Sequence, residues 1–60
     1  MTFERVRTAA YRRGFVLRDT PRRNYAGMYS AWNGYLGIRL CADTLTGLYR
    51  LLLDYPHTDI

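Results

Sequence analysis

Arginine is the residue type in this sequence whose number and spacing could do chemistry. All nine basic residues are arginine, a usage that genomic base composition could also produce. The first 23 residues hold seven of them against two carboxylates, Glu4 and Asp19, for a net charge of +5. The rest of the chain holds two arginines against three aspartates, a net of −1. Because guanidinium groups bond phosphate and carboxylate in a planar, bidentate manner, the basic third predicts affinity for an anionic partner.

Six of these arginines are the candidate residues for binding that partner: Arg5, Arg12, Arg13, Arg18, Arg22 and Arg23. The partner could be DNA, RNA or an acidic protein surface. The alternative is a solvated face whose charge keeps a small domain in solution.

Catalytic and metal-binding constellations are not predicted. His57 is the single histidine and Ser30 the single serine, and neither has a base, nucleophile or ligand set at a suitable spacing. The five carboxylates are scattered along the chain. We therefore expect no enzymatic activity, no catalytic residue, no bound metal and no cofactor.

Cysteine usage and hydropathy bear on the compartment. The single cysteine, Cys41, cannot form an intramolecular disulfide, which favours a reducing, cytoplasmic location. Cys41 is interpreted as a buried residue near a strand end, with a reactive thiol as the alternative. No apolar run approaches the ~18 residues of a membrane span, and arginines interrupt the N-terminal stretch before a secretory signal forms. We expect no membrane partner.

The elements that must position these residues form one predicted α+β domain, residues 1–60. Residues 19–26 are an Arg-rich loop and residues 56–60 a tail. The predicted order is helix, three antiparallel strands, helix (α-β-β-β-α), with both helices on one face of the sheet. Residues 15–18 supply the strand that completes the sheet, because a hairpin alone would not be stable.

Both helices are predicted from apolar periodicity and from their capping residues. Residues 2–13 begin at the N-cap Thr2 and stop before Gly14. Residues 44–54 begin at Asp43 as N-cap. The apolar faces are Phe3, Val6 and Ala10 in the first helix, and Leu45, Leu48, Tyr49 and Leu52, widened by Leu51, in the second.

The dipeptide Asn33-Gly34 is the strongest local signal. Between two β-rich runs it predicts a type I′ turn of two residues, in which both residues have positive φ. That turn would pair Trp32 with Tyr35 and would set the register of the whole hairpin.

Alternation in this register sorts the hairpin side chains onto two faces. The face predicted for the core holds Tyr29, Ala31, Leu36, Ile38 and Leu40. The open face also carries Ser30 and Gly37, and its candidate partner-binding residues are Met28, Trp32, Tyr35 and Arg39.

Three interpretations of the open face remain. Its rings could stack on nucleotide bases, worth about 1–3 kcal/mol per base. The face could bind a protein, or a second copy of this chain, since Trp, Tyr, Met and Arg are enriched at interfaces. It could also be cross-strand pairing alone, worth roughly 0.2–1 kcal/mol. The single charge counted on this face favours a protein partner.

Residues 12–18 (RRGFVLR), the Arg-rich loop after them, the Tyr-containing hairpin and the Leu-rich helix opened by DTL at residues 43–45 resemble short accessory proteins of phages, prophages and actinobacterial genomes. The resemblance covers most of the chain, residues 5–53. Phage-borne proteins of this kind with known roles are often stoichiometric inhibitors of host nucleic-acid machinery, and anti-CRISPR proteins are among them. The resemblance implies no site residues.

Two functions are consistent with these features. The first is a non-catalytic protein-binding module, a phage or mobile-element inhibitor that docks on host nucleic-acid machinery. The alternative is a small nucleic-acid-binding protein that uses the N-terminal arginines.

Overall fold

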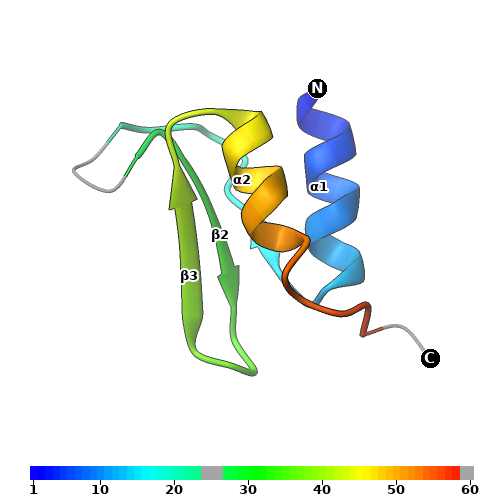
Figure 1. Cartoon of the computed structure of the whole chain (residues 1–60). Coiled ribbons are helices and arrows are strands. Elements are labelled where there is room, and N and C mark those ends of the chain that lie inside the picture. The colour runs from blue at the N-terminus through cyan, green and yellow to red at the C-terminus, as the bar shows by residue number, and fades with distance from the viewer. Residues whose placement is uncertain (24–26, 59–60) are drawn as a thin grey trace.

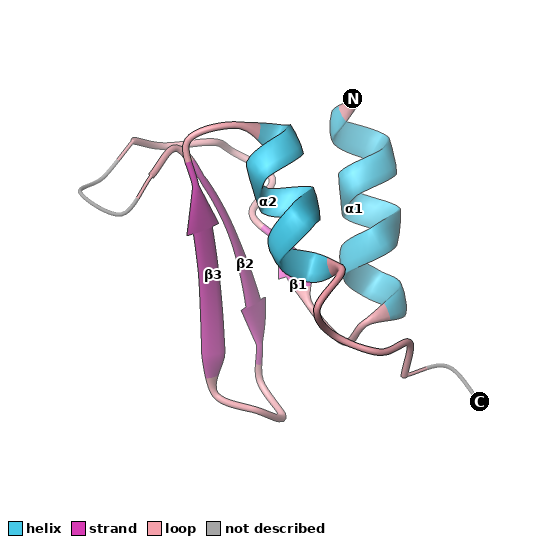
Figure 2. Cartoon of the chain, viewed as in Figure 1, coloured by secondary structure: helices cyan, strands magenta, loops and turns pink. Residues whose placement is uncertain are grey.

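The computed structural model describes residues 1–23 and 27–58, and it confirms the predicted α-β-β-β-α order (Figure 1). The elements are α1 (Phe3–Arg12), β1 (Val16–Leu17), β2 (Tyr29–Asn33), β3 (Ile38–Ala42) and α2 (Leu45–Leu52). The antiparallel sheet has the order β1-β2-β3. Both helices pack on the same face of this sheet, α1 against β1 and α2 against β2 and β3 (Figure 2). Residues 24–26 of the predicted loop and 59–60 of the predicted tail lie outside the described residues.

Helix α1 begins and ends where its capping residues predict. The Thr2 Oγ1 accepts the Arg5 N–H at 3.2 Å. At the other end Gly14 adopts a φ of 83°, its N–H donates to the Tyr11 carbonyl, and the Phe15 N–H donates to the Ala10 carbonyl at 2.8 Å. These two bonds form a Schellman cap, which requires a residue that tolerates positive φ. The cap turns the chain directly into Phe15, the first core residue after the helix.

The core lies between the helices and the inner face of the sheet. Phe15 and Leu17 face inward, while Val16 between them is exposed. The ring of Tyr55 packs edge-on against Phe15, with 5.0 Å between the ring centroids. The buried cluster consists of Val6, Ala10, Phe15, Leu17, Ala31, Leu48 and Leu52.

Helix α2 starts one residue later than predicted. Thr44, not Asp43, is the N-cap, and its Oγ1 accepts the Gly47 N–H at 3.0 Å. The Asp43 carboxylate instead accepts a hydrogen bond from Arg23. Leu48 and Leu52 are buried as predicted, but Leu51 is on the exposed side of the helix and does not widen the apolar face.

The hairpin register differs from the prediction. The turn contains four residues, 34–37, so Trp32 pairs with Arg39 and not with Tyr35. Neither Asn33 nor Gly34 has positive φ; Gly37 does, at 67°. Asn33 is buried because its Oδ1 accepts the Leu36 N–H at 3.0 Å and its Nδ2 donates to the Arg13 carbonyl. The bond to Arg13, 20 residues away, holds Asn33 in the strand, and the local bond from Leu36 closes the turn in the residues after it.

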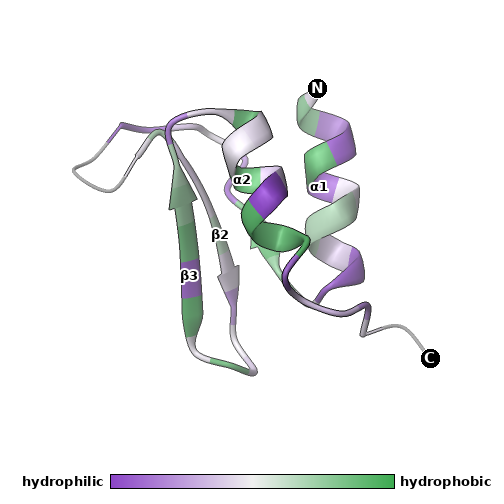
Figure 3. Cartoon of the chain, viewed as in Figure 1, coloured by the Kyte–Doolittle hydropathy of each residue, from purple (hydrophilic) through white to green (hydrophobic). Residues whose placement is uncertain are grey.

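The register shift is four residues, an even number, so the two faces of the hairpin keep most of their predicted members. Ala31 is buried, and Tyr29, Ile38 and Leu40 pack against the core. Trp32 and Arg39 remain outside, and a hydrophilic segment interrupts the otherwise hydrophobic β3 (Figure 3). Leu36, predicted for the core, is 57% exposed because it belongs to the turn.

Two glycine variants distinguish the observed turn from the predicted one. Gly37→Ala is expected to lower the free energy of unfolding by about 1–2 kcal/mol, since alanine must adopt the left-handed conformation there. Gly34→Ala is expected to change it by less than about 0.5 kcal/mol, because the added Cβ meets only Trp32 Nε1 at 3.7 Å. Urea denaturation of both variants measures the difference. The reverse order of stabilities would indicate the two-residue turn.

The tail is partly anchored. The Thr58 N–H donates to the Arg12 carbonyl at 2.7 Å, and the Thr58 hydroxyl lies 3.3 Å from the same oxygen. These bonds cover the carbonyl end of α1 and hold the C-terminal segment beside it.

Candidate functional site

The outer face of the sheet, away from both helices, carries a shallow groove of about 390 Å³. Strand alternation points one or two side chains from each strand into it. We call this site the outer groove; it is lined by Val16, Arg18, Ser30, Trp32 and Arg39.

Trp32 and Arg39 form a stacked pair at the centre of the outer groove. They are opposite each other in β2 and β3, and the Arg39 Cζ lies 5.7 Å from the centroid of the Trp32 ring. Trp32 is 45% exposed. A cation–π contact at such an exposed site is worth about 0.5–1 kcal/mol. The guanidinium therefore covers one ring face, while the rest of the ring remains accessible.

Arg18 adds a second positive charge to the outer groove. Its backbone N–H donates to the Ser30 carbonyl at 3.0 Å, which extends the pairing of β1 beyond Leu17. Its side-chain Nε donates to the Thr20 carbonyl at 3.2 Å. No aspartate or glutamate is among the described residues that line the groove. The expectation of a single charge on this face is therefore wrong.

Two other residues predicted to bind a partner on this face do not line the outer groove. Met28 is half-buried just before β2, where its N–H donates to the Ala42 carbonyl, and it does not line the outer groove. Tyr35 is 96% exposed in the turn 34–37. It borders a neighbouring apolar hollow that it shares with Val16 and Trp32.

The six arginines predicted to bind one anionic partner are distributed over three places. Arg18 lies in the outer groove. Arg22 and Arg23 lie in the loop before β2, where the Arg22 N–H donates to the Met28 carbonyl and Arg23 forms a 3.2 Å ion pair with Asp43. Arg5, Arg12 and Arg13 lie on the helical side. The six arginines therefore do not line one common groove.

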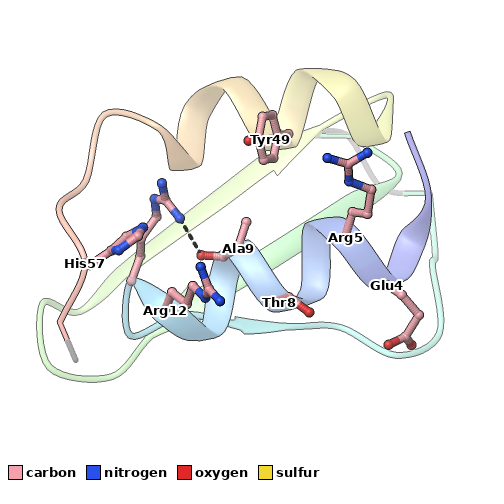
Figure 4. Close-up of a pocket in the computed structure, with 8 residues that line it drawn as sticks. Glu4, Arg5, Thr8, Ala9, Arg12, Tyr49 and His57 are labelled. Carbon is pink, nitrogen blue, oxygen red and sulfur yellow. Dashed lines mark hydrogen bonds between the residues drawn. The ribbon is translucent and has the colours of Figure 1, made fainter.

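The helical side contains a second groove, of about 400 Å³, between α1, α2 and the tail (Figure 4). Arg5 and Arg12 flank it at two levels of α1, with Thr8 and Ala9 between them. Tyr49 closes it from α2. We call this site the helix groove; its lining residues are Glu4, Arg5, Thr8, Ala9, Arg12, Arg13, Tyr49 and His57.

Arg13 and Glu4 are already engaged within the chain. The Arg13 Nη1 donates to the Ala9 carbonyl at 2.9 Å, and its buried Nε has no hydrogen-bond partner among the described residues. The Glu4 Oε1 forms an ion pair with the Arg7 Nη1, at a distance of 3.4 Å. A hydrogen bond with Tyr11 and the negative charge of Glu4 raise the pKa of Arg7 above its usual value. Arg5 and Arg12 are thus the arginines of the helix groove that make no ion pair or side-chain hydrogen bond within the described part of the chain.

Sequence reasoning missed several lining residues. Val16 enters the outer groove because β1 pairs with β2 at Val16 and Trp32, and the alternation of side chains after Phe15 was the available signal. Ser30 was predicted on the open face and lines the groove, although it was not among the candidate binding residues. Tyr49 and His57 join the helix groove only through packing of α2 and the tail against α1. Cys41 is half-buried on β3, opposite Ser30.

Residues 1–23 and 27–58 contain neither a metal-binding cluster nor a membrane-spanning helix. No set of three or more His, Cys, Asp or Glu side chains in these ranges could hold a metal ion. Neither helix has the length and apolar character needed to cross a bilayer. Comparisons with protein-family models, with curated proteins and with solved structures give no match.

Proposed function

We propose that this chain is a small non-catalytic module that binds an acidic segment of another protein through the outer groove. The observation that carries the proposal is the Trp32–Arg39 pair, an accessible aromatic ring beside a guanidinium, with a second arginine nearby and no carboxylate among the described lining residues. Trp and Arg are the residue types that most often dominate the energy of protein interfaces. Two guanidinium groups favour carboxylates, which they bind in a bidentate manner.

The geometry favours a protein over a nucleic acid at this site. A base that stacks on the Trp32 ring face that Arg39 covers would have to displace the guanidinium. A peptide carboxylate can instead bond the Arg39 guanidinium while the pair stays intact, with an apolar side chain against Val16 and the free part of the ring.

Self-association through this face is less favourable. A two-fold dimer would place identical patches against each other. Arg18 and Arg39 of both copies would then meet, with no acidic side chain between them among the groove residues that the structure describes, and like charges in contact are destabilising. A different, acidic partner removes this repulsion.

The resemblance to short phage and prophage proteins supports a role as a stoichiometric inhibitor that docks on an acidic part of host nucleic-acid machinery.

Selection from a random displayed peptide library tests the proposal, because such a selection does not require the partner to be identified first. We expect enrichment of peptides that combine Asp or Glu with an apolar anchor. Trp32→Ala should weaken the binding of the enriched peptide about 30-fold. This corresponds to a loss of ~2 kcal/mol of binding free energy, as expected for an aromatic residue at the centre of an interface. Isothermal titration calorimetry measures this, with Tyr11→Ala as the control because Tyr11 is an exposed ring on α1.

Three outcomes would contradict the proposal: a selection that enriches no acidic sequence, equal binding by the Trp32→Ala and Tyr11→Ala variants, or displacement of the peptide by single-stranded DNA. Circular dichroism of each variant verifies that the fold is retained.

A further inference from the structure

Strand β3 lies at one edge of the sheet, and no described helix or strand pairs with its outer side (Figure 1). It pairs with β2 in unbroken register over all five of its residues. Proteins usually protect such an edge with a proline, a bulge or a charged side chain, because its free backbone groups can pair with another strand. The opposite edge is protected, since β1 has only two residues and the chain reaches Pro21 shortly after it.

The free backbone groups of β3 belong to Arg39 and Cys41. The Ser30 carbonyl accepts the Arg18 N–H, so Ser30 directs its backbone groups toward β1. Cys41 lies opposite Ser30 in a non-hydrogen-bonded pair, and it therefore directs its own N–H and carbonyl away from β2. Arg39 does the same, because this pattern repeats every two residues. The donors and acceptors of the free edge are thus arranged symmetrically about Leu40.

The one charged side chain of β3 does not protect this edge. The Arg39 guanidinium lies over the ring of Trp32, which belongs to β2, so it leans away from the free edge. Cys41, the next side chain of β3 on the same face, is small and uncharged. Another strand can therefore approach without displacing the Trp32–Arg39 pair.

Helix α2 places an exposed apolar side chain on the same side of the molecule. A Cβ on Gly47 would lie 3.4 Å from the Ala42 Cβ, so this side of α2 faces β3. Leu51 follows Gly47 by four residues, about one turn, and lies on the same side of the helix, where it is 38% exposed. An isolated peptide strand on the edge would bring nothing to cover Leu51, whereas a second copy of the chain brings its own α2.

We propose that two copies of this chain associate through their β3 edges, antiparallel and two-fold symmetric about Leu40, so that their sheets join into one. Arg39 of each copy then pairs with Cys41 of the other, and each pair exchanges two backbone hydrogen bonds. On the inner face Leu40 meets its counterpart and Ile38 meets Ala42, all apolar side chains that are only partly buried in the single chain. No arginine lies directly opposite another.

This association differs from contact between two outer grooves, and it leaves both grooves open. The grooves would lie on one continuous face of the joined sheet. A partner with two acidic segments could then occupy both, which raises its apparent affinity. The edge pairing itself does not depend on what the outer groove binds.

Sedimentation velocity over a concentration series, together with amide hydrogen exchange followed by NMR, tests the proposal. We expect a monomer at low concentration and an increasing fraction of dimer up to about 1 mM, the dissociation constant of a very weak complex. In the same range exchange at the Arg39 and Cys41 amides should slow, because only the dimer gives them a hydrogen-bond partner. Since each copy carries a net charge of +4, added salt should favour the dimer.

Variants of Cys41 test the edge directly. Its N–H makes no bond to β2, so Cys41→Pro removes an edge donor without removing a bond of the single chain, and dimerisation should weaken about tenfold or more. Cys41→Ala is the matched control, because it keeps the N–H and should dimerise like the unmodified protein. Cys41→Lys serves if circular dichroism shows that the proline variant does not fold. It places a charge directly opposite Arg39 of the other copy and should also weaken the dimer.

The proposal is overturned if the chain sediments as a monomer over the whole range, if a dimer forms without slower exchange at Arg39 and Cys41, or if Cys41→Lys dimerises like Cys41→Ala. Slower exchange of these two amides on addition of the selected acidic peptide, without dimerisation, would assign the edge to that partner instead. Peptide binding by the Cys41→Lys monomer would show that the outer groove acts without the dimer, so the two proposals are tested separately.

Discussion

Phe15→Ala is expected to lower the free energy of unfolding by about 3–5 kcal/mol. Phe15 is fully buried and is among the largest fully buried side chains of the described core. Its removal leaves a cavity between the helices and the sheet and takes away the edge contact with Tyr55. A chain of this length has a total stability of only about 3–9 kcal/mol. The variant should therefore be largely unfolded, or have a thermal midpoint lower by about 15 °C or more.

Thermal denaturation followed by circular dichroism measures this effect. Tyr35→Ala is the matched control, because it also removes an aromatic ring but from a side chain that is 96% exposed. It should change stability by less than about 0.5 kcal/mol. Phe15→Leu keeps most of the buried volume and should remain folded with an intermediate midpoint. Equal midpoints for Phe15→Ala and Tyr35→Ala would show that Phe15 does not occupy the core.

Gly27→Ala is expected to lower the free energy of unfolding by about 3 kcal/mol or more, because two unfavourable effects add. Gly27 has a φ of 139°, where a side chain is strained by about 1–3 kcal/mol. A Cβ at this position would also lie 2.7 to 2.9 Å from backbone atoms of Ala42. Backbone cannot rotate away as a side chain does. The overlap would therefore push the segment before β2 away from β3 and weaken the Met28 to Ala42 hydrogen bond.

Urea denaturation, followed through the fluorescence of Trp32, measures the loss. Gly34→Ala is the reference, since its added Cβ has only ordinary contacts. Gly27→Ala should be the less stable of the two by several kcal/mol. Similar midpoints would mean that the chain before β2 can shift at little cost, and that the close approach to Ala42 does not constrain the sheet.

Local features of the sequence predicted the helices and the two faces of the hairpin. Helix α1 begins at the Thr2 cap and ends at the Gly14 cap. The hydrogen bonds of both caps join residues at most five positions apart, so they depend on little beyond the local chain. The alternation that places Trp32 outside and Ala31 inside is likewise a local property of a strand. These predictions are confirmed because each follows from residues close in sequence.

The turn was predicted incorrectly because its determinant is tertiary. Asn33 bonds the Arg13 carbonyl, 20 residues away, and this contact places it in β2 and not in the turn. A two-residue turn at Asn33-Gly34 was the best local solution, but it would remove Asn33 from that bond. Tyr35 and Leu36 consequently lie in the loop, where neither can pair with a residue of β2.

The candidate sites differ in how much of each could be predicted from the sequence. By itself, the sequence determined the α-β-β-β-α order, the basic N-terminal third and an exposed Trp32 with Arg39 on the same face, because these follow from composition and from periods of two and 3.6 residues. Only the tertiary structure decided that Arg18 joins Arg39 and that Arg5 and Arg12 line a separate groove. The physical reason is that the strand and helix which carry these arginines pack on opposite layers, and a linear charge count contains no information about layers.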